Sequence, residues 1–363
     1  MKKTSFKLNL GPHHPSTHGV LRLILELEGE KIISCEPDVG YLHRGMEKMA
    51  EKMSYIQYLP LVDRIDYLSG FFYSELLCRT IEKAMQIELS DKVRAIRVML
   101  LELNRISSHL LWIGAFLLDL GATSPFFYAF REREMILRFF EKLTGQRMMY
   151  NYFVFGGVRH DIDFLEDVEN ILKILPKKLN DYEKIITDNP IFLSRTKNIG
   201  ILEPEFAINH AITGVNLRTS GVNYDYRLQD KLYKGFDVTP VVLNDKDSWG
   251  RYQARIMEIR ESLKIIYQAI EYLKKSEKLE QKLVNPLSLK LPKGEYFSQI
   301  EAPRGISSCY IISDEKDAPY RLKWRTASYY SVNLLRKFLV GTYLNDAIAI
   351  AGSLDIILPE VDK

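Results

Sequence analysis

The chain has 363 residues and is 46% apolar, so it is longer than a typical single domain and can supply a substantial core. Its 50 basic and 47 acidic residues give a net charge of +3, which does not support nucleic-acid binding. The longest apolar run, at 110–118, has about half the length that a membrane-spanning helix needs. No signal peptide is evident, and three widely spaced cysteines indicate a reducing compartment without structural disulfides. We therefore expect a soluble, intracellular protein that associates with a membrane only through partners.

The N-terminal 40 residues predict a small β unit. Alternating apolar residues at 20–27 predict a strand, and a second extended run at 31–39 follows across a turn at 28–30. We therefore expect a hairpin. The segment 11–19 precedes it and contains turn-forming glycines and prolines. Three histidines lie in that segment: His13, His14 and His18.

Local composition leaves three interpretations of these histidines. They are solvated side chains of an entry loop, they bind a metal ion as neutral imidazoles, or one of them donates a proton or hydrogen bond to a polar ligand. Against a metal site, His13 and His14 are adjacent, and no cysteine lies close in sequence to complete a ligand set.

Residues 47–188 are expected to be mainly helical. Ser90 is a suitable cap for a long helix whose apolar residues recur at helical spacing, and Gly121 predicts its end. The next helix is predicted over 124–145, with Ser124 as its cap and a proline in its first turn.

The C-terminal third predicts another long helix, a linker and a short sheet. Apolar residues at helical spacing predict the helix over 251–278, and the stretch 286–294 is the clearest linker. A final helical segment follows three short predicted strands: 296–300, 307–312 and 320–324.

These elements predict the α+β class. We expect one interwoven domain over 1–363, in which a small β hairpin unit (1–40) precedes a mainly helical core with a long-helix bundle (41–285). A mixed region of strands and helix (286–363) completes it.

Long sequence blocks resemble the large quinone-site subunit of respiratory complex I, the D subunit of NADH–quinone oxidoreductases. The resemblance covers essentially the whole chain. It is carried, in order, by GPHHPSTHGVLRL (11–23), DVGYLHRGME (38–47), DRIDY (63–67), LLDLGATSPFFYAFRER (117–133), GQRM (145–148), GGV (156–158), SGVNYD (220–225) and GSLDIILPEVDK (352–363).

The resemblance implies a quinone head-group pocket. His18 and Tyr67 match the family's two head-group ligands, and both side chains are proton donors at neutral pH; His14 is assigned to the same pocket. Asp119 is implied to form a charge-assisted hydrogen bond with His18. Without the resemblance, Tyr67 would be interpreted as an ordinary half-buried aromatic residue and Asp119 as a residue that caps the following turn.

Arg44 matches a family arginine that lies near the terminal iron–sulfur cluster of a partner subunit, where its charge would favour the reduced cluster. The alternative is a solvent-facing loop arginine. One departure from the family concerns Met149, because several relatives have a histidine there. Coupling of the cluster potential to protonation of that histidine is therefore not expected in this chain.

The family is similar in fold to nickel–iron hydrogenase large subunits, which hold their metals with four cysteines. The corresponding positions here are Asp66, Ser69, Ile357 and Glu360. Because such sites need thiolate ligands, we expect no metal ion on this chain. The chain also lacks the cysteines that would ligate an iron–sulfur cluster.

The resemblance implies a peripheral-arm subunit of a proton-translocating NADH–quinone oxidoreductase that takes quinone as substrate. Iron–sulfur clusters, NADH and flavin would belong to partner subunits. The implied partners are the iron–sulfur subunit with the terminal cluster, the small accessory C subunit of the connecting module and membrane-arm subunits, at the cytoplasmic face of the membrane in a bacterium or archaeon. Two alternatives stay open: an equivalent subunit fed by ferredoxin or a reduced deazaflavin, and a non-catalytic scaffold.

Overall fold

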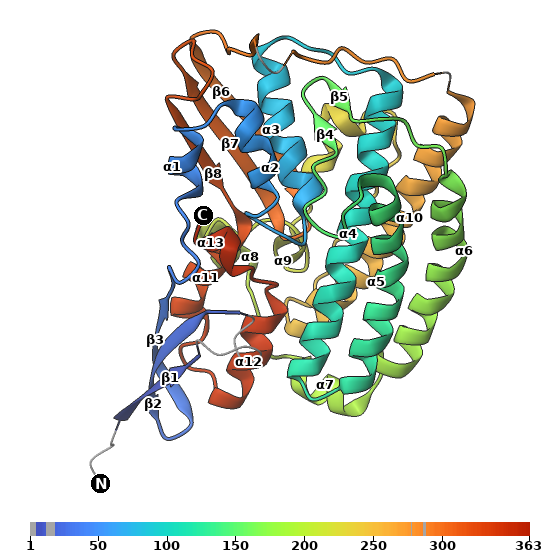
Figure 1. The fold of residues 1–363 in the computed structure, drawn as a ribbon. Coiled ribbons are helices and arrows are strands. Elements are labelled where there is room, and N and C mark those ends of the chain that lie inside the picture. The colour runs from blue at the N-terminus through green and yellow to red at the C-terminus, as the bar shows by residue number, and fades with distance from the viewer. Residues whose placement is uncertain (1–4, 12–18, 277, 286–287) are drawn as a thin grey trace.

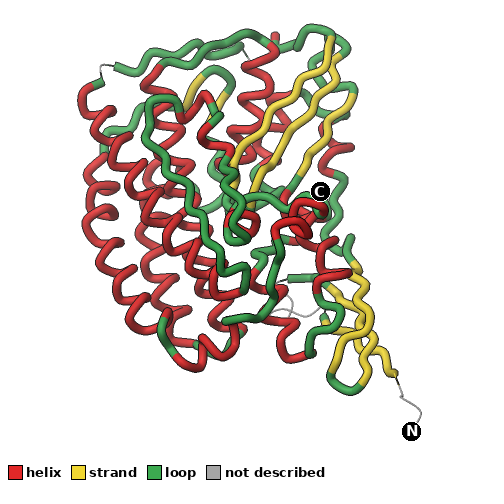
Figure 2. Tube along the Cα trace, turned by 180° about the vertical axis from the view of Figure 1, so that it is seen from behind, coloured by secondary structure: helices red, strands yellow, loops and turns green. Residues whose placement is uncertain are grey.

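The computed structural model describes residues 5–11, 19–276, 278–285 and 288–363. Long helices gather on one side of the molecule, and the two three-stranded sheets lie on the other (Figures 1 and 2). This arrangement confirms the predicted α+β class. None of the helices in the described ranges is long and apolar enough to cross a membrane.

The elements have the following bounds. The strands are β1 (Ser5–Leu10), β2 (Arg22–Glu28), β3 (Lys31–Asp38), β4 (Phe153–Val154), β5 (Gly157–Val158), β6 (Gly294–Ala302), β7 (Gly305–Ser313) and β8 (Arg321–Arg325). The α-helices are α1 (Met46–Ala50), α2 (Tyr55–Val62), α3 (Gly70–Ala84), α4 (Asp91–Asp119), α5 (Thr123–Thr144), α6 (Leu165–Tyr182), α7 (Pro190–Thr196), α8 (Pro204–Asn209), α9 (Val215–Arg218), α10 (Ser248–Lys275), α11 (Ala327–Phe338), α12 (Leu344–Ser353) and α13 (Leu358–Val361). Short helical turns of other types are η1 (Glu183–Thr187), η2 (Tyr226–Leu228) and η3 (Lys231–Tyr233).

The N-terminal sheet contains the predicted hairpin. β2 and β3 pair antiparallel around Gly29, whose φ of +63° suits the turn. β1 adds a third antiparallel strand on the other side of β2. Alternate leucines of β2 are buried and pack in one apolar cluster with residues of α11 and α12. The predictions for His13, His14 and His18 lie outside the described residues.

The helical hairpin of α4 and α5 follows the predicted pattern, with one correction. Ser90 caps α4 by accepting a hydrogen bond from the Val93 N–H at 3.4 Å, and Gly121 follows the helix with φ +91°. The Ala122 N–H donates to the Leu117 carbonyl at 2.8 Å, which completes a Schellman motif. The predicted cap at Ser124 is wrong. Because this motif reverses the chain so tightly, α5 already begins at Thr123, and Ser124 lies inside it.

The C-terminal sheet also confirms its predicted strands. β6, β7 and β8 form an antiparallel sheet in that order. The register pairs Ala302 with Gly305, so Pro303 and Arg304 form a two-residue turn between β6 and β7. A Cβ at Gly305 would meet Thr213 Oγ1 at 2.5 Å, so only glycine permits this close approach. The turn therefore carries Arg304 into the interior, where it is 3% exposed.

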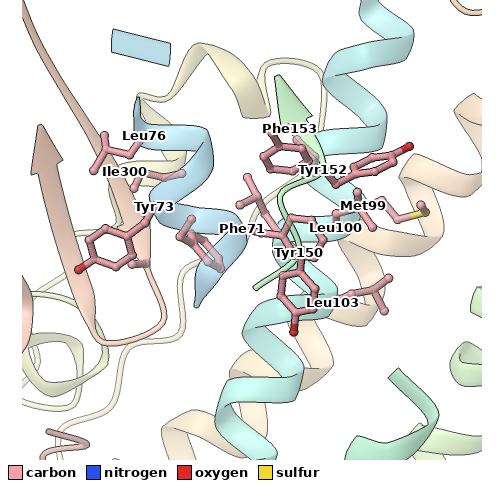
Figure 3. Close-up of a cluster of buried hydrophobic side chains, with 14 of the residues drawn as sticks. Phe71, Tyr73, Leu76, Met99, Leu100, Leu103, Tyr150, Tyr152, Phe153 and Ile300 are labelled. Atoms are coloured by element: carbon pink, nitrogen blue, oxygen red, sulfur yellow. The ribbon is translucent and has the colours of Figure 1, made fainter. Parts of the chain in front are cut away.

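The main core joins the bundle to this sheet. Phe71 of α3 stacks on Tyr150 with ring centroids 4.2 Å apart, and Phe140 of α5 meets the same tyrosine edge-on at 4.7 Å. Figure 3 shows Tyr150 beside Leu100 of α4, and Ile300 of β6 beside Leu76 and Tyr73 of α3. The predicted helix over 251–278 is α10, which starts at Ser248 because the Asp247 side chain accepts from the Gly250 N–H at 2.7 Å.

Candidate functional site

Tyr67 lies in the turn between α2 and α3. Asp66 accepts a hydrogen bond from the Leu68 N–H at 3.0 Å, and Asn104 of α4 donates to the Leu68 carbonyl at 2.9 Å, so the turn is tied to the bundle. Tyr67 itself is half-buried, and its hydroxyl hydrogen-bonds to no residue that the structure describes. Burial raises the pKa of Tyr67, and Asp66 raises it further. The phenol is therefore protonated at neutral pH and available as a donor.

A buried ionic cluster lies behind Tyr67. The Arg304 guanidinium donates to Asp66 Oδ2 at 2.6 Å and to Ser69 Oγ at 2.9 Å, and its Nε lies 3.5 Å from Asp355 Oδ1. Burial raises the pKa of Asp66 to about 6, although Arg304 opposes that shift. The pKa of Arg304 is raised: burial alone would lower it, but the Asp355 and Asp66 carboxylates outweigh burial. Arg304 therefore stays charged.

Glu360 closes the other side of this cluster. The Tyr73 hydroxyl donates to Glu360 Oε1 at 2.6 Å, and Ser328 donates to Oε2 through both its hydroxyl and its N–H. The Glu360 carboxylate also contributes to the raised pKa of Asp66. Of the four positions matched to hydrogenase cysteines, Asp66 and Ser69 share the Arg304 guanidinium, while Ile357 and Glu360 share Ser328.

The Arg44 side chain contacts the turn that carries Tyr67. Its guanidinium donates to the Arg64 carbonyl at 2.7 Å, three residues before Tyr67, while the side chain stays exposed. The loop that carries Arg44 is held by Asp362, which accepts from the N–H groups of Gly40 and Leu42 at 2.9 Å each. An arginine on an exposed loop thus becomes a neighbour of the Tyr67 turn through contacts with the C-terminal segment.

Asp119 is the last residue of α4 and is half-buried. Ser108, one of the partners of Arg304, lies eleven residues earlier on the same helix. At 1.5 Å per residue the two positions are ~16 Å apart along the helix axis. The described residues therefore place Asp119 and the Tyr67 turn at separate levels of α4, and the implied contact with His18 lies outside the described residues.

The sequence comparisons identify the family. Residues 119–363 match the family described as "Respiratory-chain NADH dehydrogenase, 49 Kd subunit". The NADH-quinone oxidoreductase D subunit of Bacillus mycoides is 45% identical over 359 residues, which cover 98% of both chains. The D subunit of Geobacillus kaustophilus is 46% identical over 98% of this chain and 97% of its own. The chain belongs to this 49 Kd subunit family.

Two arginines of the site in this family member were missed from the sequence. Arg304 sits in a two-residue turn, and only the strand register shows that it points inward. Arg133 of α5 is 7% exposed and interacts electrostatically with Tyr67. Arg133 stands at the end of the block 117–133 that carries the family resemblance, so its position was available as a signal.

The groove beside β8 is separate from these residues. Within the described part of the chain, no group of three or more His, Cys, Asp or Glu side chains could hold a metal ion; the expected lack of a metal stays a prediction. A groove of about 370 Å³ lies beside β8, lined by aromatic and basic residues such as Tyr310, Tyr329 and Arg325. Of the predicted site residues within the described ranges, Tyr67, Asp119 and Arg44 do not line this groove.

Proposed function

We propose that this chain is the quinone-site subunit of a proton-translocating NADH–quinone oxidoreductase. Family membership supports the complex, because the relatives are named as D subunits of NADH-quinone oxidoreductase. The observation that carries the site is Tyr67. Its half-buried phenol hydrogen-bonds to no described residue and lies against a buried ionic cluster. A positioned donor without a protein acceptor is suited to a ligand oxygen.

The proposed reaction transfers two electrons and two protons to the quinone. The electrons arrive singly from an iron–sulfur cluster of a partner subunit, and each reduced quinone oxygen takes one proton. Tyr67 supplies one of these protons. Its raised pKa keeps the phenol protonated until negative charge forms on a quinone oxygen. Asp66 and Arg304 hold the turn that positions it.

The remaining predicted residues have separate roles in this proposal. His18 supplies the second proton, with His14 in the same pocket, and Asp119 orients and charges His18 through a hydrogen bond. Arg44 faces the partner's cluster, an assignment supported by its exposed side chain beside the Tyr67 turn. Quinone is the substrate, and the chain itself holds no flavin or cluster.

The proposed partners are the iron–sulfur subunit with the terminal cluster, the small accessory C subunit and membrane-arm subunits at the quinone entry. In a bacterium or archaeon the protein would lie at the cytoplasmic face of the membrane as a peripheral protein. We also propose that residues 1–363 form one domain. The N-terminal strands pack in one cluster with α11 and α12, which supports this proposal.

A non-catalytic scaffold that joins the iron–sulfur subunit to the membrane arm is the alternative. A scaffold needs no half-buried donor that lacks an acceptor among the described residues, so Tyr67 favours the catalytic role. An equivalent subunit fed by ferredoxin or a reduced deazaflavin would use the same pocket. The redox partner that reduces the clusters in purified complex distinguishes these electron donors.

The test compares Tyr67→Phe and His18→Ala in the assembled complex. We expect quinone reduction to fall at least tenfold in one or both variants, since a positioned proton donor commonly contributes a factor of about 100 or more. The assay is NADH oxidation with a short-chain quinone, measured together with reduction of the iron–sulfur clusters by NADH. Cluster reduction and assembly should remain normal.

Tyr267→Phe is the matched control, because Tyr267 lies on the exposed face of α10 with 58% of its surface accessible. It should retain the parental rate. Parental quinone turnover in both Tyr67→Phe and His18→Ala would leave only the scaffold role.

A further inference from the structure

Arg133 differs from the other deeply buried arginines of this chain. It is 7% exposed, yet it forms no ion pair or hydrogen bond with any residue in the described ranges. A buried guanidinium without a counter-charge is costly, and such groups are normally paired. Burial accordingly lowers the pKa of Arg133.

The acids nearest to Arg133 in sequence are already engaged. Glu132 accepts from Arg131 at 2.6 Å and from the Tyr182 hydroxyl at 2.8 Å. Glu134 pairs with Arg138 at 3.1 Å and also with Arg147. No carboxylate of the described chain therefore forms an ion pair with Arg133, although Glu134 acts on it electrostatically.

Two phenols share the electrostatic environment of Arg133. Burial raises the pKa of both Tyr67 and Tyr150, and the positive charge of Arg133 opposes that shift in each phenol. Tyr150 is 3% exposed, and like Tyr67 its hydroxyl bonds to no residue that the structure describes. The two phenols in turn act to raise the pKa of Arg133, so these three groups, none of which forms a hydrogen bond with a described residue, interact electrostatically.

Tyr150 is held in place from two sides. Its ring stacks on Phe71, as Figure 3 shows, and the following Asn151 N–H donates to the buried Asp63 carboxylate at 3.2 Å. Met149 and Asn151 both have positive φ values, +63° and +45°, and this strained backbone fixes the direction of the tyrosine between them.

We propose that Arg133, together with Tyr150, forms the anion-binding wall of the quinone site. The proposal rests on the proposed function and adds the group that stabilises negative charge during reduction. The quinone accepts one electron from the partner's iron–sulfur cluster, and the negative charge that develops on its oxygen is stabilised by the Arg133 guanidinium. A second electron and two protons, one of them from Tyr67, then complete the quinol, while Arg133 keeps its own proton throughout.

Stabilisation of a developing oxyanion affects the rate more than the binding of the neutral substrate. In the assembled complex we expect Arg133→Met to lower kcat for a short-chain quinone at least tenfold, with a change in KM of less than about threefold. Arg133→Lys keeps the charge and should restore a large part of kcat. The semiquinone radical seen by electron paramagnetic resonance during turnover should be weaker in Arg133→Met than in the parent.

Arg138→Met is the matched control, since Arg138 lies on the same helix with 76% of its side chain exposed. Parental kcat and parental semiquinone signal in Arg133→Met would overturn the proposal. If Tyr67→Phe lost activity in the same membranes, the proposed function would survive that result. If neither Arg133→Met nor Arg133→Lys assembled into the complex, that result would also overturn the proposal. It would assign Arg133 to an ion pair with a partner subunit.

Discussion

Two buried charged regions of this molecule differ in how their charges are satisfied. The first lies between α4 and α10 and consists of arginines and carboxylates that face one another. The second lies beside the Tyr67 turn and contains Arg133, Tyr67 and Tyr150. Both are largely closed off from bulk solvent, but among the described residues only the first supplies its arginines with counter-charges.

In the α4–α10 region the pairing is dense. Arg105 lies 3.2 Å from Glu102, and Arg227 lies 2.7 Å from Asp225. Arg218 pairs with Glu258 and lies 2.8 Å from Glu301. These charges satisfy one another, so the region needs no ligand. Hydrogen bonds of Ser262 with Glu102 and of His109 with Glu258 join the two longest helices, α10 and α4, through this region.

Beside Tyr67, polar groups lack partners in the described chain. A buried donor with no acceptor costs about 1–3 kcal/mol, and more when it is charged. In the α4–α10 region single donor atoms such as Arg105 Nη1 and Arg218 Nε also lack an acceptor, but each of these guanidiniums faces a carboxylate. Arg133 has no such carboxylate partner in the described chain, which supports the ligand-binding role that we propose for its surroundings.

The comparison of the two charged regions predicts that the largest loss of stability follows substitution of Glu258. The side chain accepts from Arg218 and lies 2.9 Å from His109 Nε2. Burial alone would raise the pKa of Glu258, but Arg218 holds it well below the usual range. Glu258→Gln should destabilise the protein by about 3 kcal/mol because it removes one of the carboxylates that compensate the buried Arg218 guanidinium. The amount of assembled complex and the midpoint of its thermal inactivation measure this effect.

The control for that variant is Lys316→Met, which breaks a pair with Asp314 in which the lysine side chain is 72% exposed. It should leave both quantities at the parental value. A parental inactivation midpoint in Glu258→Gln would show that the paired region does not stabilise the fold in the way we describe.

A smaller effect is expected at Asp119. Asp119→Asn keeps the shape and most of the hydrogen bonding but removes the charge that we propose to pair with His18. We expect proton-coupled quinone turnover to fall roughly fivefold, equivalent to about 1 kcal/mol, with assembly intact. Turnover, proton release in membrane vesicles and the pH profile of activity are the measurements.

Asp91→Asn, at the exposed start of the same helix, is the control. If Asp119→Asn kept the parental turnover, proton stoichiometry and pH profile, Asp119 would have no role in coupling. It would then only be the residue at which the helix ends.

The smallest effect concerns the pH dependence of stability at Asp63. Burial raises the pKa of Asp63 to about 6, above its ordinary value of 3.8. The folded state therefore binds more protons than the unfolded state between these values, and stability falls as the pH rises from about 4 to 6. We expect Asp63→Asn to be more stable than the parent at pH 8 by about 1 kcal/mol. This is part of the roughly 3 kcal/mol that two pKa units represent, because the amide forfeits charge-assisted bonds.

That advantage should disappear as the pH is lowered to 4, where the parental carboxyl is itself neutral in the folded state. Thermal inactivation of parent and variant complexes at pH 4, 6 and 8 gives the difference directly. A variant that is less stable than the parent at all three values would show that the hydrogen bonds of Asp63 outweigh its burial.

Local rules predicted the helices and strands well, and they failed where a neighbouring element decided the boundary. Ser90 caps α4 as expected, since a serine before an apolar periodic run needs only its own chain. The start of α5 was displaced because Gly121 and Ala122 complete the end of α4. The third strand β1 was missed although Phe6, Leu8 and Leu10 alternate with polar residues, because so short a run becomes a strand only by pairing with β2.

The candidate site was predictable only in part. Tyr67, Arg44 and Asp119 were singled out from motifs, and the structure brings Arg44 to the Tyr67 turn. Tyr150 was not singled out, because one tyrosine among 21 has no distinguishing local pattern, and Arg133 was not singled out although it stands in the family block 117–133, because nothing in that block shows that its side chain is buried. Their lack of partners in the described chain becomes visible only when the neighbouring side chains are in place.

The sequence by itself determined the family, the α+β class and the residues proposed to carry the proton chemistry, because motifs and periodicities are properties of neighbouring positions in the chain. Only the tertiary structure decided which charges are satisfied. Whether an arginine meets a carboxylate depends on contacts between residues far apart in sequence, such as Arg304 with Asp66 across 238 positions. The same rule pairs Arg218 with Glu258 and leaves Arg133 without an ion pair in the described chain, and it separates the stabilising core from the site that we propose for a ligand.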